Sequence, residues 1–194
     1  MLKNYPFKAN KFEIKNGESS KNLAIFSKFK IINNGELDFP NTFNGGVYAD
    51  IVFKKDTIRF YNLHLESLSI RPNYFKRERS DKLFVRLRDS FDKQERQSDI
   101  VREHIKTSPY PVIVGGDFNN TQFSKVYFNI KGDLNDSFLE SGHGYGETIK
   151  FWKFPFRIDM ILGDPSFTFL SHNNYKINIS DHEPIMATFK VSQE

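Results

Sequence analysis

The stretch Val112-Ile113-Val114-Gly115-Gly116-Asp117-Phe118-Asn119 decides the fold, because an apolar run ends there in two glycines and then in polar side chains. A short apolar run of this kind between turn residues is typical of a buried strand. Asp117 and Asn119 are therefore expected where a rigid strand meets a loop, a common place for functional groups. Taken alone the motif is weak evidence, because the same residues also form Asx turns.

Two later motifs stand in the same relation to a strand. Arg157-Ile158-Asp159 leads into the apolar run Met160-Ile161-Leu162, and Ser180-Asp181-His182-Glu183-Pro184 leads into Ile185-Met186-Ala187. A carboxylate at a strand where solvent is scarce needs a partner. His182 is one candidate for Asp159, since a carboxylate orients an imidazole and stabilises its protonated form. Pairing of Asp159 with Arg157, or a loop cap, explains the residues equally well.

These side chains suit one kind of chemistry when they are taken together. Asp117 and Asn119 can orient a water molecule and hydrogen-bond a phosphate oxygen. Asp181 offers a hard oxygen ligand for Mg²⁺ or Mn²⁺. Asn62 and His64, near the end of another predicted strand, add donors for phosphate. Metal-assisted hydrolysis of phosphoesters needs these groups, so four motifs at four strand ends favour a single site.

The rest of the chain predicts many strands and segregated helices. Strands are expected at Asn22–Ser27, Tyr48–Phe53, Thr57–Ser67, Pro111–Gly115, Phe156–Leu162 and Ile185–Val191, with turns at Asn33-Asn34-Gly35 and Asn44-Gly45-Gly46. The early strands read as an antiparallel meander. The strand at 57–67 carries apolar side chains on both faces, which predicts a helix layer on one side and a second sheet on the other.

A helix is predicted over Tyr74–Lys106, where Leu83, Leu87 and Phe91 lie four residues apart and Ile100, Val101 and Ile105 continue the apolar face. The segment from 119 to 146 reads as rich in loops because of its glycines. The layout is α+β, with sheet packed on sheet and helices outside.

Composition sets the outer limits. A length of 194 residues fits one domain, and 38% apolar with 15% aromatic residues fits a packed interior. The absence of cysteine excludes disulfides and thiolate metal sites. No apolar run approaches the roughly 18 residues that cross a bilayer, and the start lacks a signal-like stretch, so the chain as given is expected to be soluble. A net charge of +4 mildly favours phosphate-rich partners.

In this order the motifs resemble the endonuclease/exonuclease/phosphatase superfamily, which has the DNase-I-like fold. The resemblance spans nearly the whole chain, from Leu23-Ala24-Ile25-Phe26-Ser27 through Tyr61-Asn62-Leu63-His64-Leu65-Glu66-Ser67 and Gly116-Asp117-Phe118-Asn119 to the Asp159 and His182 motifs. It implies a four-layer α/β/β/α sandwich. It also implies a catalytic His182 with Asp159 as partner, Asp117 and Asn119 to position nucleophile and phosphate, His64 as a phosphate donor and Asp181 as a metal ligand. Asn62 and Arg157 are expected to bind substrate.

One departure from the family pattern affects metal binding. The pattern begins with a strand that carries Asn, a helix, and a strand that ends in Gln-Glu, whose Glu is the principal Mg²⁺ ligand. Glu13 and Glu18 lie too close to the strand at 22–27 to replace it convincingly. Residues 1–194 are therefore expected to form a single domain truncated at its N-terminus, to bind Mg²⁺ or Mn²⁺ weakly, to have little activity, and to self-associate through an exposed sheet edge.

The leading hypothesis is a metal-dependent phosphoesterase, a nuclease or phosphatase in which water attacks in line at a His-Asp dyad. The alternative is a non-catalytic module that binds phosphate or nucleic acid. Dinuclear metallophosphatases fit poorly, because their additional His and Asp motifs are not found. Nucleic acid, inositol phosphate and a lipid headgroup all remain possible substrates, since the sequence does not show where Arg71, Lys76, Arg77, Arg79 and Lys153 converge.

Several other residues have plainer interpretations. His104 and His172 are expected at the surface, one on the amphipathic helix and one in a polar loop. His143 lies in a glycine-rich loop that could reach the cleft. The aromatic cluster Phe151, Trp152, Phe154 and Phe156 could stack on a substrate, although core packing is the more common role for aromatic residues.

Overall fold

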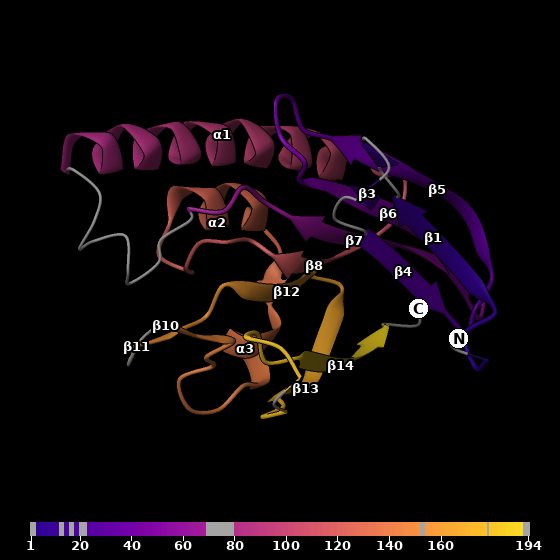
Figure 1. The fold of residues 1–194 in the computed structure, drawn as a ribbon. Coiled ribbons are helices and arrows are strands. Elements are labelled where there is room, and N and C mark those ends of the chain that lie inside the picture. The colour runs from indigo at the N-terminus through magenta and orange to yellow at the C-terminus, as the bar shows by residue number, and fades with distance from the viewer. Residues whose placement is uncertain are drawn as a thin grey trace.

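The computed structural model describes residues 3–11, 14–15, 18–19, 23–68, 80–151, 154–177 and 179–191. Figure 1 shows the long helix α1 (Ser80–Lys106) and the shorter helix α2 (Lys125–Lys131) together on one side of a large sheet. α1 and α2 contact each other, although they lie apart in the sequence. They form the outer helical layer that the sequence predicts.

The large sheet has six strands in the order β5-β6-β7-β8-β12-β9. Their bounds are β5 Ile31–Asp38, β6 Gly45–Phe53, β7 Asp56–His64, β8 Val112–Asp117, β9 Asn135–Asp136 and β12 Asp159–Gly163. β5, β6 and β7 form an antiparallel meander. The strands predicted at 48–53 and 57–67 lie in it, but the strand predicted at 22–27 pairs elsewhere and β5 takes its place. β7 and β8 run parallel, and α1 is the crossover between them. Parallel neighbours need such a crossover, which places α1 over the sheet.

The other face of this sheet is covered by two small antiparallel pairs. β1 (Phe7–Lys11) pairs with β4 (Leu23–Ser27), and β13 (Phe167–Asn174) pairs with β14 (Ile185–Val191). The remaining elements are β2 (Ile14–Lys15), β3 (Glu18–Ser19), α3 (Ser137–Ser141), β10 (Ile149–Phe151) and β11 (Phe154–Phe156). α3 packs against β13 and β12. The predicted α+β layout of sheet on sheet with helices outside is confirmed.

β7 shows why the sheet is buried on both faces. Tyr61, Leu63 and Leu65 belong to the core cluster under the helices, together with Val101 and Ile105 of α1. Ile58 and Phe60 point the other way and pack against Phe189 of β14 and its neighbours. The alternation read from the sequence is therefore the alternation of two cores, one on each side of the sheet.

An apolar groove of about 480 Å³ separates the two small pairs. Its walls are β4 and β14, and its floor includes Ile58 and Phe60 of β7. In the described part of the chain β4 pairs only with β1, and β14 only with β13. Each wall is thus a strand with one free edge, and the two free edges lie on opposite sides of one groove.

Some predicted elements were wrong. The turn predicted at Asn33-Asn34-Gly35 lies inside β5, where the register shifts between Ile31 and Asn33. Gly35 is needed there for space, because a Cβ on it would meet the Tyr48 ring at 2.6 Å. The segment predicted as loop contains α2 and α3, which Ser124 and Asp136 cap with their side chains.

The buried face of α1 also differs from the prediction. Phe91 of the predicted apolar stripe is 43% exposed, and Leu83 and Leu87 are only half-buried, so the first half of the stripe is not core. The helix instead buries Ser90, Gln94, Gln97, Val101 and Ile105. A stripe that is polar at its N-terminal end escapes a search for apolar periodicity. The Gln residues bind the loops that carry the site, as described below.

The predicted surface position of His172 was wrong, and His104 is half-buried. The ring of His104 lies between the two tyrosines of the meander, with Nδ1 2.8 Å from the hydroxyl of Tyr61. His172 is buried in β13, and its Nδ1 lies 2.7 Å from the hydroxyl of Ser137. Burial lowers the pKa of both imidazoles. His143 is exposed, as its loop suggests.

Other expectations fall outside the described residues. These concern Glu13, Asn22, the helical start at 74–79, the basic residues Arg71, Lys76, Arg77, Arg79 and Lys153, and Trp152. The side chains of Glu18 and Phe151 are likewise not described. Among the helices that are described, none is long and apolar enough to span a membrane.

Candidate functional site

Three neighbouring strands bring the predicted groups side by side. His64 ends β7, Asp117 ends β8 and Asp159 begins β12. Asp117 is the register partner of His64 on one side and of Asp159 on the other. Register partners in a sheet point their side chains to the same face. The three residues therefore form a row across one end of the large sheet, as the strand-end argument predicts.

His182 completes this row from the segment before β14. Its Nδ1 lies 2.8 Å from Oδ2 of Asp159. An isolated β-bridge between His182 and Ile149 holds the backbone of His182 next to β10. The hydrogen bond with Asp159 raises the pKa of His182 to about 9. The pairing left open from the sequence is thus Asp159 with His182, and not Asp159 with Arg157.

Asp117 and Asn119 form a compact turn at the end of β8. The backbone N–H of Asn119 donates to Asp117 Oδ1 at 2.8 Å, and its side-chain amide donates to Oδ2 at 3.1 Å. Asn119 has a φ of 50°, a left-handed conformation that Asn tolerates better than most residues. The Asx turn that these residues can form is therefore present, and it fixes the direction of the Asp117 carboxylate.

Gly116 allows β7 and β8 to approach closely just before Asp117. Its φ is 138°, and a Cβ at this position would lie 2.1 Å from the carbonyl oxygen of Leu63. Any other residue would push the strands apart at the point where His64 and Asp117 meet. The Nε2 of His64 lies 3.7 Å from Oδ2 of Asp117. At this distance the His64 ring lies next to the Asp117 carboxylate in the row.

Asn62 and Arg157 are placed differently from the other predicted residues. The Asn62 amide donates to the carbonyl of Ala24 in β4 at 3.1 Å, so it links the large sheet to a small pair. Arg157 is buried, and its guanidinium lies 2.9 Å from the carboxylate of Asp136 and over the ring of Phe138. The structure brings neither side chain into the row, and both are engaged in holding elements together.

The carboxylates of the site suit a divalent ion only in part. One ligand atom from each of Asp117, Asp159 and His182 lies within 4.8 Å of the others. Asp159 and His182 are already bonded to each other, so a cation on both would displace that hydrogen bond. Asp181 is exposed and accepts from Ser180. This donor set fits a hard cation held by one or two carboxylates and otherwise by water, which is a common mode for Mg²⁺.

Two buried residues that support the site were missed from the sequence. The Gln94 amide donates to the carbonyls of Glu66 and Asn119, at 2.6 and 3.2 Å, and accepts from Asn120. The hydroxyl of Thr148 accepts from the backbone N–H groups of Ile158 and Asp159. Gln94 lies in the polar part of the buried face of α1, which a search for apolar periodicity does not find. Thr148 stands outside every motif, and no sequence signal pointed to it.

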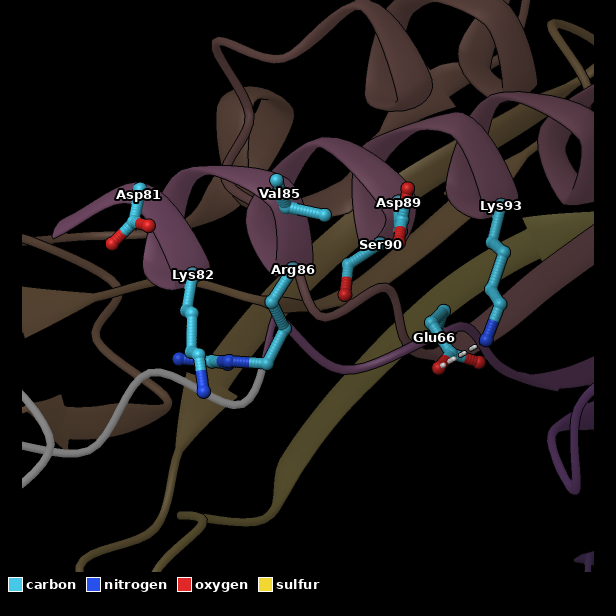
Figure 2. Close-up of a pocket in the computed structure, with 8 residues that line it drawn as sticks. All are labelled: Glu66, Asp81, Lys82, Val85, Arg86, Asp89, Ser90 and Lys93. Carbon is cyan, nitrogen blue, oxygen red and sulfur yellow. Dashed lines mark hydrogen bonds and ion pairs between the residues drawn. The ribbon is translucent and has the colours of Figure 1, made fainter. Parts of the chain in front are cut away.

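A groove of about 510 Å³ runs beside α1, next to Glu66. Figure 2 shows Lys82 and Arg86 extending to the same side of the helix, and Lys93 meeting Glu66. Lys93 is thus paired, and Arg86 donates to the carbonyl of Leu68. The groove also contains Asp81 and Asp89, so its charges balance. It lacks the excess of positive charge that would draw phosphate.

Comparison with solved structures gives the same fold at low sequence identity. A functionally unknown conserved protein from Enterococcus faecalis matches with a TM-score of 0.72 and 16% identity over 96% of this chain and 77% of that chain. A mannosyl-6-phosphatase from Bacteroides thetaiotaomicron matches with a TM-score of 0.61 and 20% identity over 95% and 78%. The human Nocturnin catalytic domain with bound sulfate anion matches with a TM-score of 0.68 and 17% identity over 95% and 73%.

Comparison with curated proteins gives no match. A family model, in contrast, matches residues 3–182, which include the first three strand-end motifs and reach His182 of the last one. The fold is DNase-I-like, as the motif order predicted. The chain belongs to the endonuclease/exonuclease/phosphatase family.

Proposed function

We propose that this protein hydrolyses a phosphoester bond by in-line attack of water activated at His182. The observation that carries the proposal is the Asp159–His182 hydrogen bond of 2.8 Å beside Asp117, at the end of a rigid sheet. Membership of a family of nucleases and phosphatases supports it. The tetrahedral sulfate named for the Nocturnin structure shows that a fold of this kind can hold a phosphate-like anion.

Each side chain has a separate part in the proposed reaction. Asp159 holds Nδ1 of His182, which leaves Nε2 to take a proton from the attacking water. The water oxygen bonds to phosphorus while the bond to the leaving oxygen breaks, and the leaving oxygen takes up a proton. Asp117 and the amide oxygen of Asn119 orient the water, because the Asn119 amide nitrogen already donates to Asp117 and to the carbonyl of Leu65. His64 donates to a phosphate oxygen.

A divalent cation is part of this proposal. Asp181 and Asp117 are the carboxylates proposed to hold Mg²⁺ or Mn²⁺, with the remaining positions left to water and substrate. When bound, the ion would neutralise charge on the phosphate. With so few protein ligands we expect weak binding, in the millimolar range for a site of low charge.

The test uses the full 194-residue chain and simple chromogenic probes. Bis(p-nitrophenyl) phosphate reports diesterase activity, and p-nitrophenyl phosphate reports monoesterase activity, each with Mg²⁺ and Mn²⁺. His182→Ala and Asp159→Asn should each lower turnover by about two to four orders of magnitude. His143→Ala removes an exposed histidine outside the row and serves as the control. Near-full activity in either dyad variant would overturn the assignment.

Binding of phosphate without hydrolysis is the second candidate, and the sparse set of metal ligands favours it. Calorimetric titration with Mn²⁺ and with inorganic phosphate separates the two. A binding module would hold phosphate, lose that affinity in the His64→Ala variant, and leave both chromogenic probes intact. DNA, inositol phosphates and a phospholipid headgroup are the natural substrates to test next, because the family description covers both nucleases and phosphatases.

A further inference from the structure

Thr148 lies at the junction of the two segments that carry the dyad. It is fully buried, two residues after Gly146 and just before β10. Its hydroxyl oxygen accepts from the N–H of Ile158 at 3.0 Å and from the N–H of Asp159 at 3.1 Å. Two consecutive N–H groups on one oxygen fix the peptide plane from which the Asp159 side chain departs.

The main chain of Thr148 reaches the other segment. Its carbonyl oxygen accepts from the N–H of Glu183, the residue after His182, at 2.7 Å. Its own N–H donates to the carbonyl of Phe156 at 2.9 Å. One residue thus ties the backbone beside Asp159 to the backbone beside His182.

The peptide before Asp159 is held from a second side as well. The carbonyl oxygen of Ile158 accepts from the N–H of Phe118, the residue after Asp117, at 2.8 Å. The peptide unit between Ile158 and Asp159 therefore lies between Thr148 and the end of β8. Removal of the Thr148 hydroxyl frees one of these two restraints and leaves the other in place, so the local fold should survive while the Asp159 carboxylate loses its fixed direction.

We propose that Thr148 is a positioning residue for the Asp159–His182 pair, acting through its side-chain hydroxyl. The expected effect on rate rests on the proposed phosphoesterase function. The expected effect on the Asp159–His182 hydrogen bond rests on geometry alone. Displacement of a reacting group by about 1 Å can cost about 100-fold in rate. Because the Thr148 hydroxyl contacts backbone N–H groups and no side chain of the row, its loss should lower kcat and leave KM unchanged.

The test compares Thr148→Val, which keeps the shape of the side chain without its oxygen, with Thr148→Ser, which keeps the oxygen. With bis(p-nitrophenyl) phosphate we expect kcat of the Val variant to fall about 10- to 100-fold at constant KM, and the Ser variant to retain most of the wild-type kcat. Ser98→Ala, which removes a buried hydroxyl in α1 bonded to Glu95 and Asn129, controls for loss of stability alone.

A second readout needs neither substrate nor activity. In ¹⁵N-labelled protein, the Nδ1 proton of His182 should give a downfield resonance because it donates to Asp159; its absence from His182→Ala assigns it. Thr148→Val should shift or remove this resonance, and Thr148→Ser and Ser98→Ala should keep it. An unchanged resonance in the Val variant overturns the proposal, even if no chain hydrolyses the probe. If the wild type hydrolyses no probe but the spectral change is as expected, the role of Thr148 in holding the pair is upheld, and binding of phosphate without hydrolysis is favoured over hydrolysis by this chain.

Discussion

Asp117 and Asp159 are register partners on adjacent antiparallel strands, so two carboxylates face the same side at one end of the sheet. Like charges this close are costly unless each has its own compensation. Asp117 receives two hydrogen bonds from Asn119, and Asp159 receives one from His182. Asp117 is thus held by its own turn, and Asp159 is held by the imidazole of His182.

The pH dependence of turnover tests the role of His182. Asp159 raises the pKa of His182 to about 9, so the ring is protonated at neutral pH. A general base must be unprotonated, and kcat/KM should therefore rise with pH, about tenfold per unit, and level off near pH 9. Asp159→Asn removes the cause of the raised pKa, so the rise should end at lower pH and the plateau should also be lower. Initial rates with bis(p-nitrophenyl) phosphate from pH 6 to about 10 measure both.

A profile that is flat up to pH 9 and then falls would contradict the role of His182 as a base. In that case the protonated ring would be the active form, and it would act by donating to a phosphate oxygen. Asp117 would then be the group left to activate the water.

Substitution at Gln94 should separate support of the site from support of the fold. Gln94→Leu leaves the carbonyls of Glu66 and Asn119 and the amide of Asn120 without this partner, at a cost of about 1–3 kcal/mol in the free energy of unfolding. Asn119 should also shift, which lowers kcat by about tenfold to a hundredfold. Urea unfolding and steady-state kinetics measure the two effects.

Gln97→Leu is the matched control, because Gln97 is buried on the same helix and accepts from the N–H of Glu66 without touching Asn119. It should lose similar stability and keep kcat within about threefold of wild type, as expected for a substitution that spares the transition state. Equal losses of kcat in the two variants would show that Gln94 has no particular link to the site.

Substitution of Arg157 tests the prediction that this residue binds substrate. Its guanidinium and the Asp136 carboxylate are both almost fully buried and face each other. Arg157→Met should lower the free energy of unfolding by about 3–5 kcal/mol, because it leaves a buried carboxylate without its cation. KM of the remaining folded enzyme should be unchanged. A normal unfolding midpoint together with a raised KM would restore Arg157 as a substrate-binding residue.

The sequence predicted the convergence of three polar side chains better than it predicted the elements around them. Asp117, Asp159 and His182 follow or precede apolar runs, and a strand end has a defined place in a sheet, so their convergence could be inferred. Gln94 and Thr148 could not be found in this way. Their contacts join residues far apart in the chain, and a buried Gln or Thr carries no periodic signal.

The wrong predictions about the fold have related causes. Asn33-Asn34-Gly35 has the composition of a turn, yet the Tyr48 ring requires a glycine inside a strand. His172 stands among polar residues, but α3 covers it from a segment more than thirty residues earlier in the chain. Tertiary contacts override local preference at both places.

Self-association is the last expectation, and the groove between β4 and β14 gives it a physical basis. A strand with a free edge pairs readily with another chain, and Phe26 and Phe29 expose apolar surface beside this edge. We expect the 194-residue chain to associate in the micromolar range. Sedimentation velocity over a concentration series measures this, and Phe26→Lys should shift the species towards monomer because a lysine on an edge strand opposes pairing.

Phe128→Lys makes the same change at an exposed position on α2 and should leave association unaltered. A wild-type chain that stays monomeric throughout the series, or an equal effect of both lysine variants, would show that the β4 edge does not drive association.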